Sequence, residues 1–287
     1  MVTSANNLAG QVHIHASDLT LAYDDFIVQK DLNFSIMRGD IFIIMGGSGC
    51  GKSTLLRHLI GLNRPARGEI LVENIDLCSA TESQRKQILL SMGVLFQSGA
   101  LFSSLTLAEN VSLALSLSQS ISLSVKEMRE LASFKLSLVG LRGFEDYYPY
   151  EISGGMRKRA GIARAIALDP RILFLDEPSA GLDPISAKLL DDLILELRNN
   201  LGATIVVVTH ELPSIFTIAN NSIFLDEETK TIIASGNPND LLNHSDNEKV
   251  QRFLTRGGNL KLDQLNVNQQ YPAPPSTTEY NSGMNQS

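Results

Sequence analysis

Short continuous apolar runs recur along the chain, at residues 41–45, 172–175 and 204–208. Runs of this length and composition are typical of strands that are buried on both faces of a sheet. Stretches with helical spacing lie between these runs. Strands and helices that alternate in this way predict an α/β fold, with a parallel sheet and right-handed crossover connections.

Weaker patterns predict the remaining strands. Residues 12–21 and 32–37 alternate between apolar and polar positions, and residues 69–72 and 92–96 are short strand candidates. Two further runs close the folded part of the chain and are expected to form a hairpin: 222–226 and 231–235. His13 and His15 lie two apart on the first strand, so they face the same side, where a solvated face is expected rather than a metal site.

Capping signals and apolar stripes predict the helices. Ser124 and Glu127 have the spacing of a capping box, and a second helix is expected to run to about Asp169, where Pro170 stops it. Gly202 is expected to end a third helix. The apolar stripe predicted on that third helix consists of Leu189, Leu193, Leu197 and Leu201. Ser245 and Glu248 are candidate caps of the last helix.

A glycine-rich segment, residues 46–53, lies between the first apolar run and a helix. Its G-x-x-x-x-G-K-S pattern in this strand-to-helix context predicts a phosphate-binding loop, whose backbone N–H groups cradle phosphate oxygens. Lys52 supplies a cation for the phosphates, and the Ser53 hydroxyl can bind Mg²⁺. The residues expected to contact ATP here are Gly46, Gly47, Ser48, Gly49, Cys50, Gly51, Lys52, Ser53 and Thr54.

Polar residues follow the predicted strands at their carboxyl ends, where ligands bind in parallel sheets. Asp176 ends a buried strand and is placed to hold Mg²⁺, while Glu177 is the candidate for polarising the attacking water. His210 can hydrogen-bond the γ-phosphate, and Gln97 can contact the metal and the water. The phosphate loop and all four residues converge on one edge of the predicted sheet.

Taken together, these motifs resemble those of the ATP-binding cassette (ABC) ATPases over roughly residues 12–254. The motifs carrying the resemblance are a Walker A loop (46–53), a Q-loop (Gln97), a signature (Ser153, Gly154 and Gly155), a Walker B strand with its glutamate (173–177), a D-loop (179–183) and a switch histidine (His210). The resemblance implies a homodimer that sandwiches two ATP molecules, with Walker A of one subunit facing the signature of the other. It also implies that Tyr23 stacks on the base and that Asp183 belongs to the nucleotide site.

The resemblance further implies a parallel-sheet core with an antiparallel β subdomain and an α-helical subdomain at about residues 100–168. On this basis the chain divides into an ATP-binding domain, 1–254, and a polar tail, 255–287. The tail carries Tyr271 and Tyr280 among prolines. We hypothesise that it lies across the other ATPase subunit; a free polar end is the alternative.

A methionine, Met156, stands where the ABC signature usually has glutamine. With residues 96–102, this variant resembles the ATPase subunits of the Mla-type phospholipid transporters of Gram-negative bacteria. That likeness implies an integral membrane permease (MlaE-like), an MCE lipid-binding protein (MlaD-like) and a STAS-domain protein (MlaB-like), with the ATPase on the cytoplasmic face of the inner membrane. An importer of another solute is the alternative, and a non-transport ABC ATPase is a more distant one.

Charge and cysteine content narrow the picture. The net charge of −7 argues against a broad nucleic-acid-binding surface. Cys50 and Cys78 lack metal or redox spacing and are expected to be reduced thiols. Cys50 lies beside a helix N-terminus, which favours a thiolate, so alkylation is expected to block activity; a buried, inert thiol is the alternative.

Overall fold

The computed structural model describes residues 11–117 and 123–257. The tail residues Tyr271 and Tyr280, and the arm hypothesis built on them, lie outside the described residues. The strands are β1 (Val12–Tyr23), β2 (Phe26–Met37), β3 (Ile41–Gly46), β4 (Arg67–Val72), β5 (Ile75–Asp76), β6 (Met92–Leu95), β7 (Ile172–Asp176), β8 (Thr204–Val208), β9 (Asn221–Leu225) and β10 (Ile232–Ser235).

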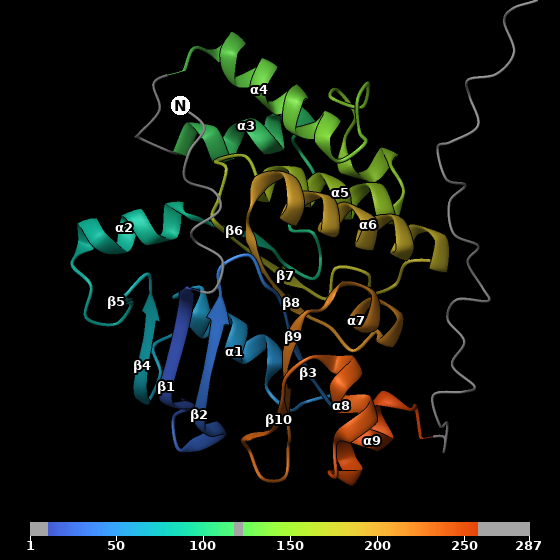
Figure 1. The fold of residues 1–287 in the computed structure, drawn as a ribbon. Helices are drawn as coiled ribbons and strands as arrows, with labels where there is room; N and C mark the ends of the chain where they lie inside the picture. The colour runs from blue at the N-terminus through green and yellow to red at the C-terminus, as the bar shows by residue number, and fades with distance from the viewer. Residues whose placement is uncertain (1–10, 118–122, 258–287) are drawn as a thin grey trace, which may run out of the picture.

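Helices connect and cover these strands (Figure 1). They are α1 (Lys52–Leu59), α2 (Glu82–Leu90), α3 (Leu107–Leu117), α4 (Val125–Leu138), α5 (Gly154–Ala165), α6 (Pro184–Leu201), α7 (Leu212–Ile218), α8 (Pro238–His244) and α9 (Glu248–Leu254), with a 3₁₀ turn η2 (Pro149–Glu151). Within the described ranges, none of these helices is long and apolar enough to cross a membrane.

Two sheets organise the molecule. The central sheet has the order β10-β9-β3-β8-β7-β6, and every neighbouring pair in it is parallel except β10 with β9. The second sheet, in the order β2-β1-β4-β5, is antiparallel. The α/β fold with its parallel sheet and antiparallel β subdomain is therefore confirmed.

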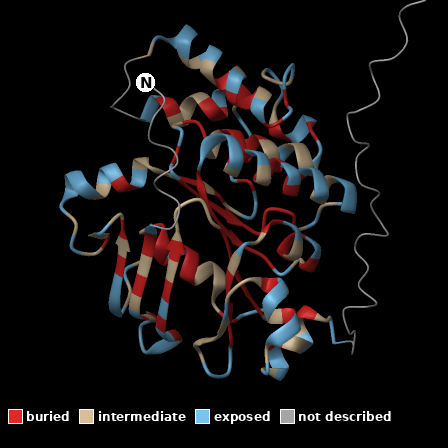
Figure 2. Ribbon diagram, in the orientation of Figure 1, coloured by how far each residue is buried: buried red, intermediate tan, exposed pale blue. Residues whose placement is uncertain are grey.

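The central sheet separates two hydrophobic cores, which explains its continuous apolar runs. In β3, Ile41, Ile43 and Met45 pack into one core, and Phe42 and Ile44 pack into the other. Successive strand residues point to opposite faces, so a strand between two cores must be apolar throughout. In the burial view the central strands are red along their length (Figure 2).

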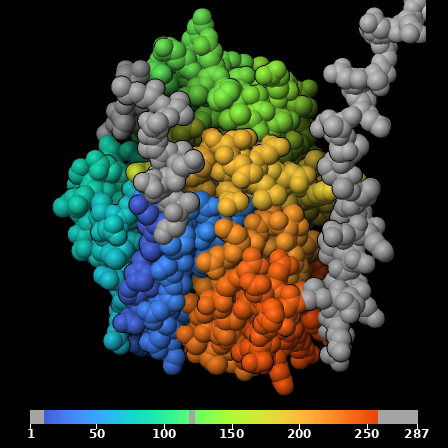
Figure 3. Space-filling view, viewed as in Figure 1, coloured from blue at the N-terminus to red at the C-terminus, as the bar shows by residue number. Residues whose placement is uncertain are grey.

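Different elements pack against the two sides of the central sheet. Helices α3 to α6 contribute to the first core, and α1 and the antiparallel sheet contribute to the second. Helices α3 and α4 form a separate layer at one end of the molecule, shown in green in the space-filling view (Figure 3). The predicted capping box is present there, since the Ser124 hydroxyl accepts from Glu127 N and the Glu127 carboxylate accepts from Ser124 N.

Three helix predictions are corrected. Helix α5 ends at Ala165 rather than near Asp169, which is left-handed (φ 50°) and precedes Pro170, a position that disfavours helix. In α6, Leu189 is 54% exposed, because a strict four-residue spacing drifts around the helix; the buried face is Leu190, Asp191, Leu193, Ile194 and Leu197. Helix α9 is capped by Asn247, whose Oδ1 accepts from Lys249 N at 3.0 Å, and not by Ser245.

The expectation that His13 lies on a solvated face is wrong. Its ring is 2% exposed, with Nδ1 2.7 Å from the Thr204 hydroxyl and Nε2 3.3 Å from the Glu73 carboxylate. Burial and the nearby Arg38 lower its pKa to about 4. His13 thus joins the antiparallel sheet to the central sheet at β8.

We expect His13 to make the protein less stable in mild acid. Between its ordinary pKa of 6.5 and its folded value of about 4, the unfolded chain binds a proton that the folded chain does not, so stability falls as the pH falls through this window. A shift of this size corresponds to up to about 3 kcal/mol. Denaturant unfolding of His13→Gln at a series of pH values should show a shallower fall; parallel curves would contradict the assignment. His15→Gln is the control for losing a histidine from the same strand.

Candidate nucleotide site

The phosphate loop joins β3 to α1 through a backbone that only glycine fits at two points. Gly51 caps α1 in a left-handed conformation (φ 96°), and a Cβ there would lie 2.7 Å from Val28 Cγ1. A Cβ on Gly46 would overlap the Leu225 carbonyl oxygen and lie 2.7 Å from Cys50 Sγ. The sequence motif therefore forms a tight loop wrapped over the N-terminus of a helix, the geometry of an anion site.

Lys52 occupies this loop in a resting position. Its Nζ donates to the carbonyl oxygens of Gly46 at 3.0 Å and Gly47 at 2.7 Å. The ammonium thus lies over the loop, on the pocket that the loop lines. Because both partners are neutral carbonyls, a phosphate can replace them with a stronger charge-assisted contact.

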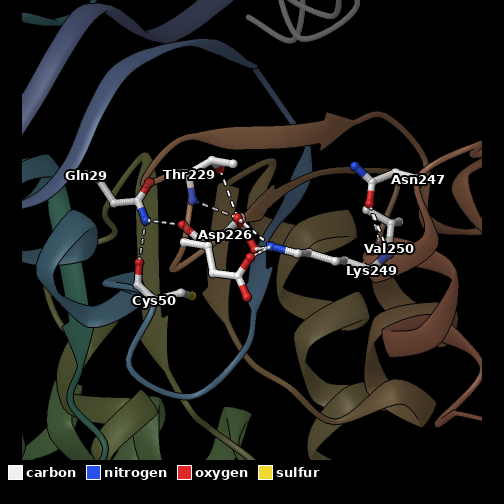
Figure 4. Close-up of polar contacts among 8 residues, drawn as sticks. Gln29, Cys50, Asp226, Thr229, Asn247, Lys249 and Val250 are labelled. Atoms are coloured by element: carbon white, nitrogen blue, oxygen red, sulfur yellow. Dashed lines mark hydrogen bonds and ion pairs between the residues drawn. The ribbon is translucent and has the colours of Figure 1, made fainter.

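A chain of polar contacts supports the loop from behind (Figure 4). The buried amide of Gln29 donates to the Cys50 carbonyl at 2.7 Å and to the Asp226 carbonyl at 2.9 Å. The Asp226 carboxylate in turn accepts from Lys249 of α9 at 2.9 Å and from the Thr229 hydroxyl, also at 2.9 Å. The phosphate loop is therefore connected to the C-terminal helix through the end of β9.

Ser53 and Asp176 come together as expected. The Ser53 hydroxyl donates to Asp176 Oδ1 at 3.1 Å, across the edge of the central sheet. Burial raises the pKa of Asp176, so a bound cation would offset the cost of keeping its carboxylate charged there. Two oxygens beside a phosphate pocket fit Mg²⁺, which takes few protein ligands and completes its shell with phosphates and water. Within residues 11–117 and 123–257, no group of three or more His, Cys, Asp or Glu side chains could hold a metal ion. When bound, Mg²⁺ would neutralise phosphate charge.

Glu177 and His210 form the second pair. Glu177 Oε1 lies 2.8 Å from His210 Nδ1, whereas Oε2 is buried and lacks a hydrogen-bond partner among the residues described. Glu177 is 8% exposed and adopts φ 47°. A buried carboxylate oxygen left open beside a phosphate pocket is suited to accept a proton from water.

One pocket of about 750 Å³ brings these groups together. The predicted site residues that line it are Gly46, Gly47, Ser48, Gly49, Gly51, Lys52, Ser53, Thr54, Gln97, Glu177 and His210. Leu212 also lines it, as do three residues at and beyond the end of α9 that no sequence motif indicated: Arg252, Phe253 and Arg256. Phe253 is fixed edge-on against Phe224, with centroids 5.0 Å apart. The C-terminal helix and the residues just after it thus add two cations to the wall of a pocket built for anions.

The signature residues and Asp183 are among the predicted residues that lie outside this pocket lining. Ser153 caps α5, its hydroxyl accepting from Met156 N at 3.2 Å, and Gly154 and Gly155 form the first turn. Asp183 caps α6, accepting from Ile185 N and Ser186 N at 3.0 Å each. Their contacts with a nucleotide stay predictions.

Two further predictions concern Tyr23 and Cys50. Tyr23 ends β1, is 45% exposed and accepts a hydrogen bond from Asn63 at 3.2 Å; it does not line the pocket, and its stacking on a base stays a prediction. Cys50 is 1% exposed and burial raises the pKa of its thiol, so the expectation of a reactive thiolate is wrong. Cys50 contributes to the loop through its backbone.

Residues 29–180 match the family model described as ABC transporter. Together with the phosphate loop, Asp176 and Glu177 at one sheet edge, this match defines the class: the protein is an ABC-type ATPase, which binds and hydrolyses ATP. More particularly, the chain belongs to the ABC transporter family.

Similar proteins come from several transport systems. The chain is 40% identical over 243 residues to "Probable ribonucleotide transport ATP-binding protein mkl" of Mycobacterium tuberculosis, covering 85% of this chain and 66% of that protein, so it spans about two thirds of the relative's length. It is 38% identical to "Intermembrane phospholipid transport system ATP-binding protein MlaF" of Haemophilus influenzae, covering 83% of this chain and 89% of that protein.

Two solved structures share the fold. The dimeric post-hydrolysis state of the ATP-binding cassette MJ0796, bound to ADP and Pi, has a TM-score of 0.71 at 30% identity, covering 78% of this chain and 98% of that one. CbiO1 from Clostridium perfringens, described as part of the ABC transporter complex cbiONQ, has a TM-score of 0.74 at 28% identity, covering 91% of this chain and 99% of that one.

Proposed function

We propose that this chain is the ATP-hydrolysing subunit of a transporter that moves phospholipids between the inner and outer membranes and maintains the lipid asymmetry of the outer membrane. The observation that carries the proposal is the match to MlaF, which includes 89% of that protein's length. Met156 in the signature supports the same subgroup. An importer of another solute is the second candidate, favoured by the 40% identity to mkl.

In this proposal the working unit is a homodimer. The position of Ser153 supports a homodimer. Ser153 does not line the pocket that Lys52 lines, so in this proposal the signature meets a nucleotide on the phosphate loop of a partner subunit. The dimeric MJ0796 cassette provides a precedent for such a pair. The dimer binds the cytoplasmic face of an integral membrane permease and works with an MCE lipid-binding protein and a STAS-domain protein.

Isolation of the intact complex tests the proposal. The full-length chain, tagged and expressed from its own locus, would be purified from detergent-solubilised membranes, and the co-purifying proteins and lipids identified by mass spectrometry. We expect a permease and bound phospholipid, and ATP-dependent phospholipid transfer between vesicles after reconstitution. A permease whose ATPase is stimulated by a small solute, with no lipid transfer, would overturn the lipid assignment and support the second candidate.

A further inference from the structure

A buried lysine connects the two loops that line the nucleotide pocket. Lys158 lies on α5 and is 9% exposed. Its Nζ donates hydrogen bonds to the carbonyl oxygen of Gln97 and, at 3.1 Å, to that of Glu177. Gln97 follows β6 and Glu177 follows β7, and these strands are neighbours in the central sheet. One ammonium group therefore joins the ends of both strands.

We propose that Lys158 is a positioning residue for ATP hydrolysis, holding the backbone of Gln97 and Glu177 so that their side chains face the nucleotide. Both contacts go to backbone carbonyls, so both side chains remain free to act in the pocket that they line. The inference rests on the proposed roles of Gln97 and Glu177 and adds to them a residue outside the pocket lining.

The backbone of Glu177 needs such support. Its φ of 47° is in the left-handed region, which costs a non-glycine residue on the order of 1 kcal/mol or more and persists only where the surroundings fix it. Here the N–H donates to the Val208 carbonyl at 2.8 Å, and the carbonyl accepts from Ala180 N at 3.3 Å and from Lys158 Nζ at 3.1 Å. Without Lys158 one of these three restraints is lost, and the carboxylate is held less firmly in its position 2.8 Å from His210.

Helix α5 itself is held tightly against the loop that follows Gln97. A Cβ on Gly161 would lie 2.6 Å from Leu95 Cδ1, so glycine allows the helix to approach. Arg164 donates to the Ala100 carbonyl at 2.5 Å and to the Gly99 carbonyl at 3.3 Å. Lys158, Gly161 and Arg164 are spaced three apart, which places them on the same side of the helix within an arc of about 120°. These contacts hold the backbone of Lys158 close to the loop that follows Gln97.

The charge of Lys158 fits this role. Burial lowers the pKa of its ammonium, and the carboxylates of Asp176 and Glu177 act in the opposite direction. Their negative charges offset part of the desolvation cost of the cation. Replacing the lysine by an apolar residue would leave two carbonyl oxygens without this donor.

The test compares two neutral variants of Lys158 in the full-length protein. Lys158→Met keeps the length of the side chain but cannot donate, so kcat should fall by about 10²-fold, the effect expected of a misplaced catalytic group. The dissociation constant of ATP should change little, because Lys158 does not line the pocket. Lys158→Gln, whose amide can still donate, should recover part of kcat.

Lys135 provides a matched control. It is a buried lysine on α4, 2% exposed, and its Nζ lies 2.5 Å from Asp169 Oδ1, away from the pocket lining. Lys135→Met also removes a buried cation, so thermal unfolding should show a loss of stability. Its kcat, measured below the unfolding transition, should match that of the unmodified protein.

The proposal is overturned if Lys158→Met keeps its kcat, if Lys135→Met loses as much kcat, or if Lys158→Met weakens ATP binding as strongly as it slows turnover. Measuring Glu177→Gln in the same assay distinguishes a failure of the Lys158 proposal from a failure of the proposed catalytic role of Glu177. An active Glu177→Gln would mean that the catalytic assignment fails. An inactive Glu177→Gln together with an active Lys158→Met would mean that only the role of Lys158 fails.

Discussion

Replacing Glu177 by glutamine is expected to lower the rate of ATP hydrolysis by roughly 10²-fold or more while leaving ATP affinity intact. The substitution keeps the shape of the side chain and one oxygen that can remain near His210 Nδ1, now 2.8 Å from Oε1. What it removes is the capacity of the carboxylate to take a proton from water. The loss should therefore appear in kcat, measured by phosphate release, and not in the dissociation constant of ATP.

Glu211 offers a matched control for Glu177. Its carboxylate lies 3.8 Å from the other ring nitrogen of His210 but is 41% exposed and does not line the pocket. Glu211→Gln therefore removes a carboxylate from the same histidine without touching the site, and its turnover should be close to that of the unmodified protein. Near-normal turnover in Glu177→Gln would exclude it as the group that activates water.

Much of the pocket could be predicted because strand ends determine its position. Continuous apolar runs identify strands buried on both faces, and in a parallel sheet their carboxyl ends share one edge. Glu177 and His210 follow such strands and Gln97 follows the shorter, half-buried β6, and all three line the pocket with the phosphate loop. Local patterns are sufficient here because the parallel topology brings residues that follow different strands to the same edge of the sheet.

The contribution of the C-terminal helix to the pocket could not be predicted in the same way. Arg252 and Arg256 follow an ordinary helix start, and nothing in their spacing indicates a phosphate loop about 200 residues earlier in the chain. Their placement depends on tertiary contacts such as Lys249 with Asp226 and Phe253 with Phe224. Tertiary contacts of this kind leave no periodic pattern in the sequence.

The burial of individual polar side chains is the other property that local sequence patterns do not predict. Lys158 lies between Arg157 and Arg159, and the three basic residues look equivalent in the sequence. Only Lys158 points at the two loops of the pocket. The predictions for His13 and Cys50 are wrong for the same reason. The polarity of His13 and the helix position of Cys50 suggest exposure, but a second element covers each side chain. Which side of an element faces another sheet or loop is decided by the whole fold.

Replacing Lys52 by methionine is expected to weaken ATP binding by about 10- to 100-fold, the loss of a charge-assisted hydrogen bond worth roughly 1.5–3 kcal/mol. In the free protein its Nζ already donates to the Gly46 and Gly47 carbonyls, so binding exchanges these contacts for phosphate oxygens. The net effect is therefore expected toward the lower end of that range. Titration calorimetry with ATP under conditions that prevent hydrolysis would measure it directly.

Lys126→Met is the control, because Lys126 is 86% exposed on α4 and its removal changes the net charge by the same amount. Its ATP affinity should be unchanged, which separates a contact in the pocket from a general loss of positive charge. Lys52→Met and Glu177→Gln should also differ in kind: the first raises the dissociation constant of ATP, and the second lowers turnover. An unchanged dissociation constant in Lys52→Met would show that the ammonium stays on its own loop when ATP binds.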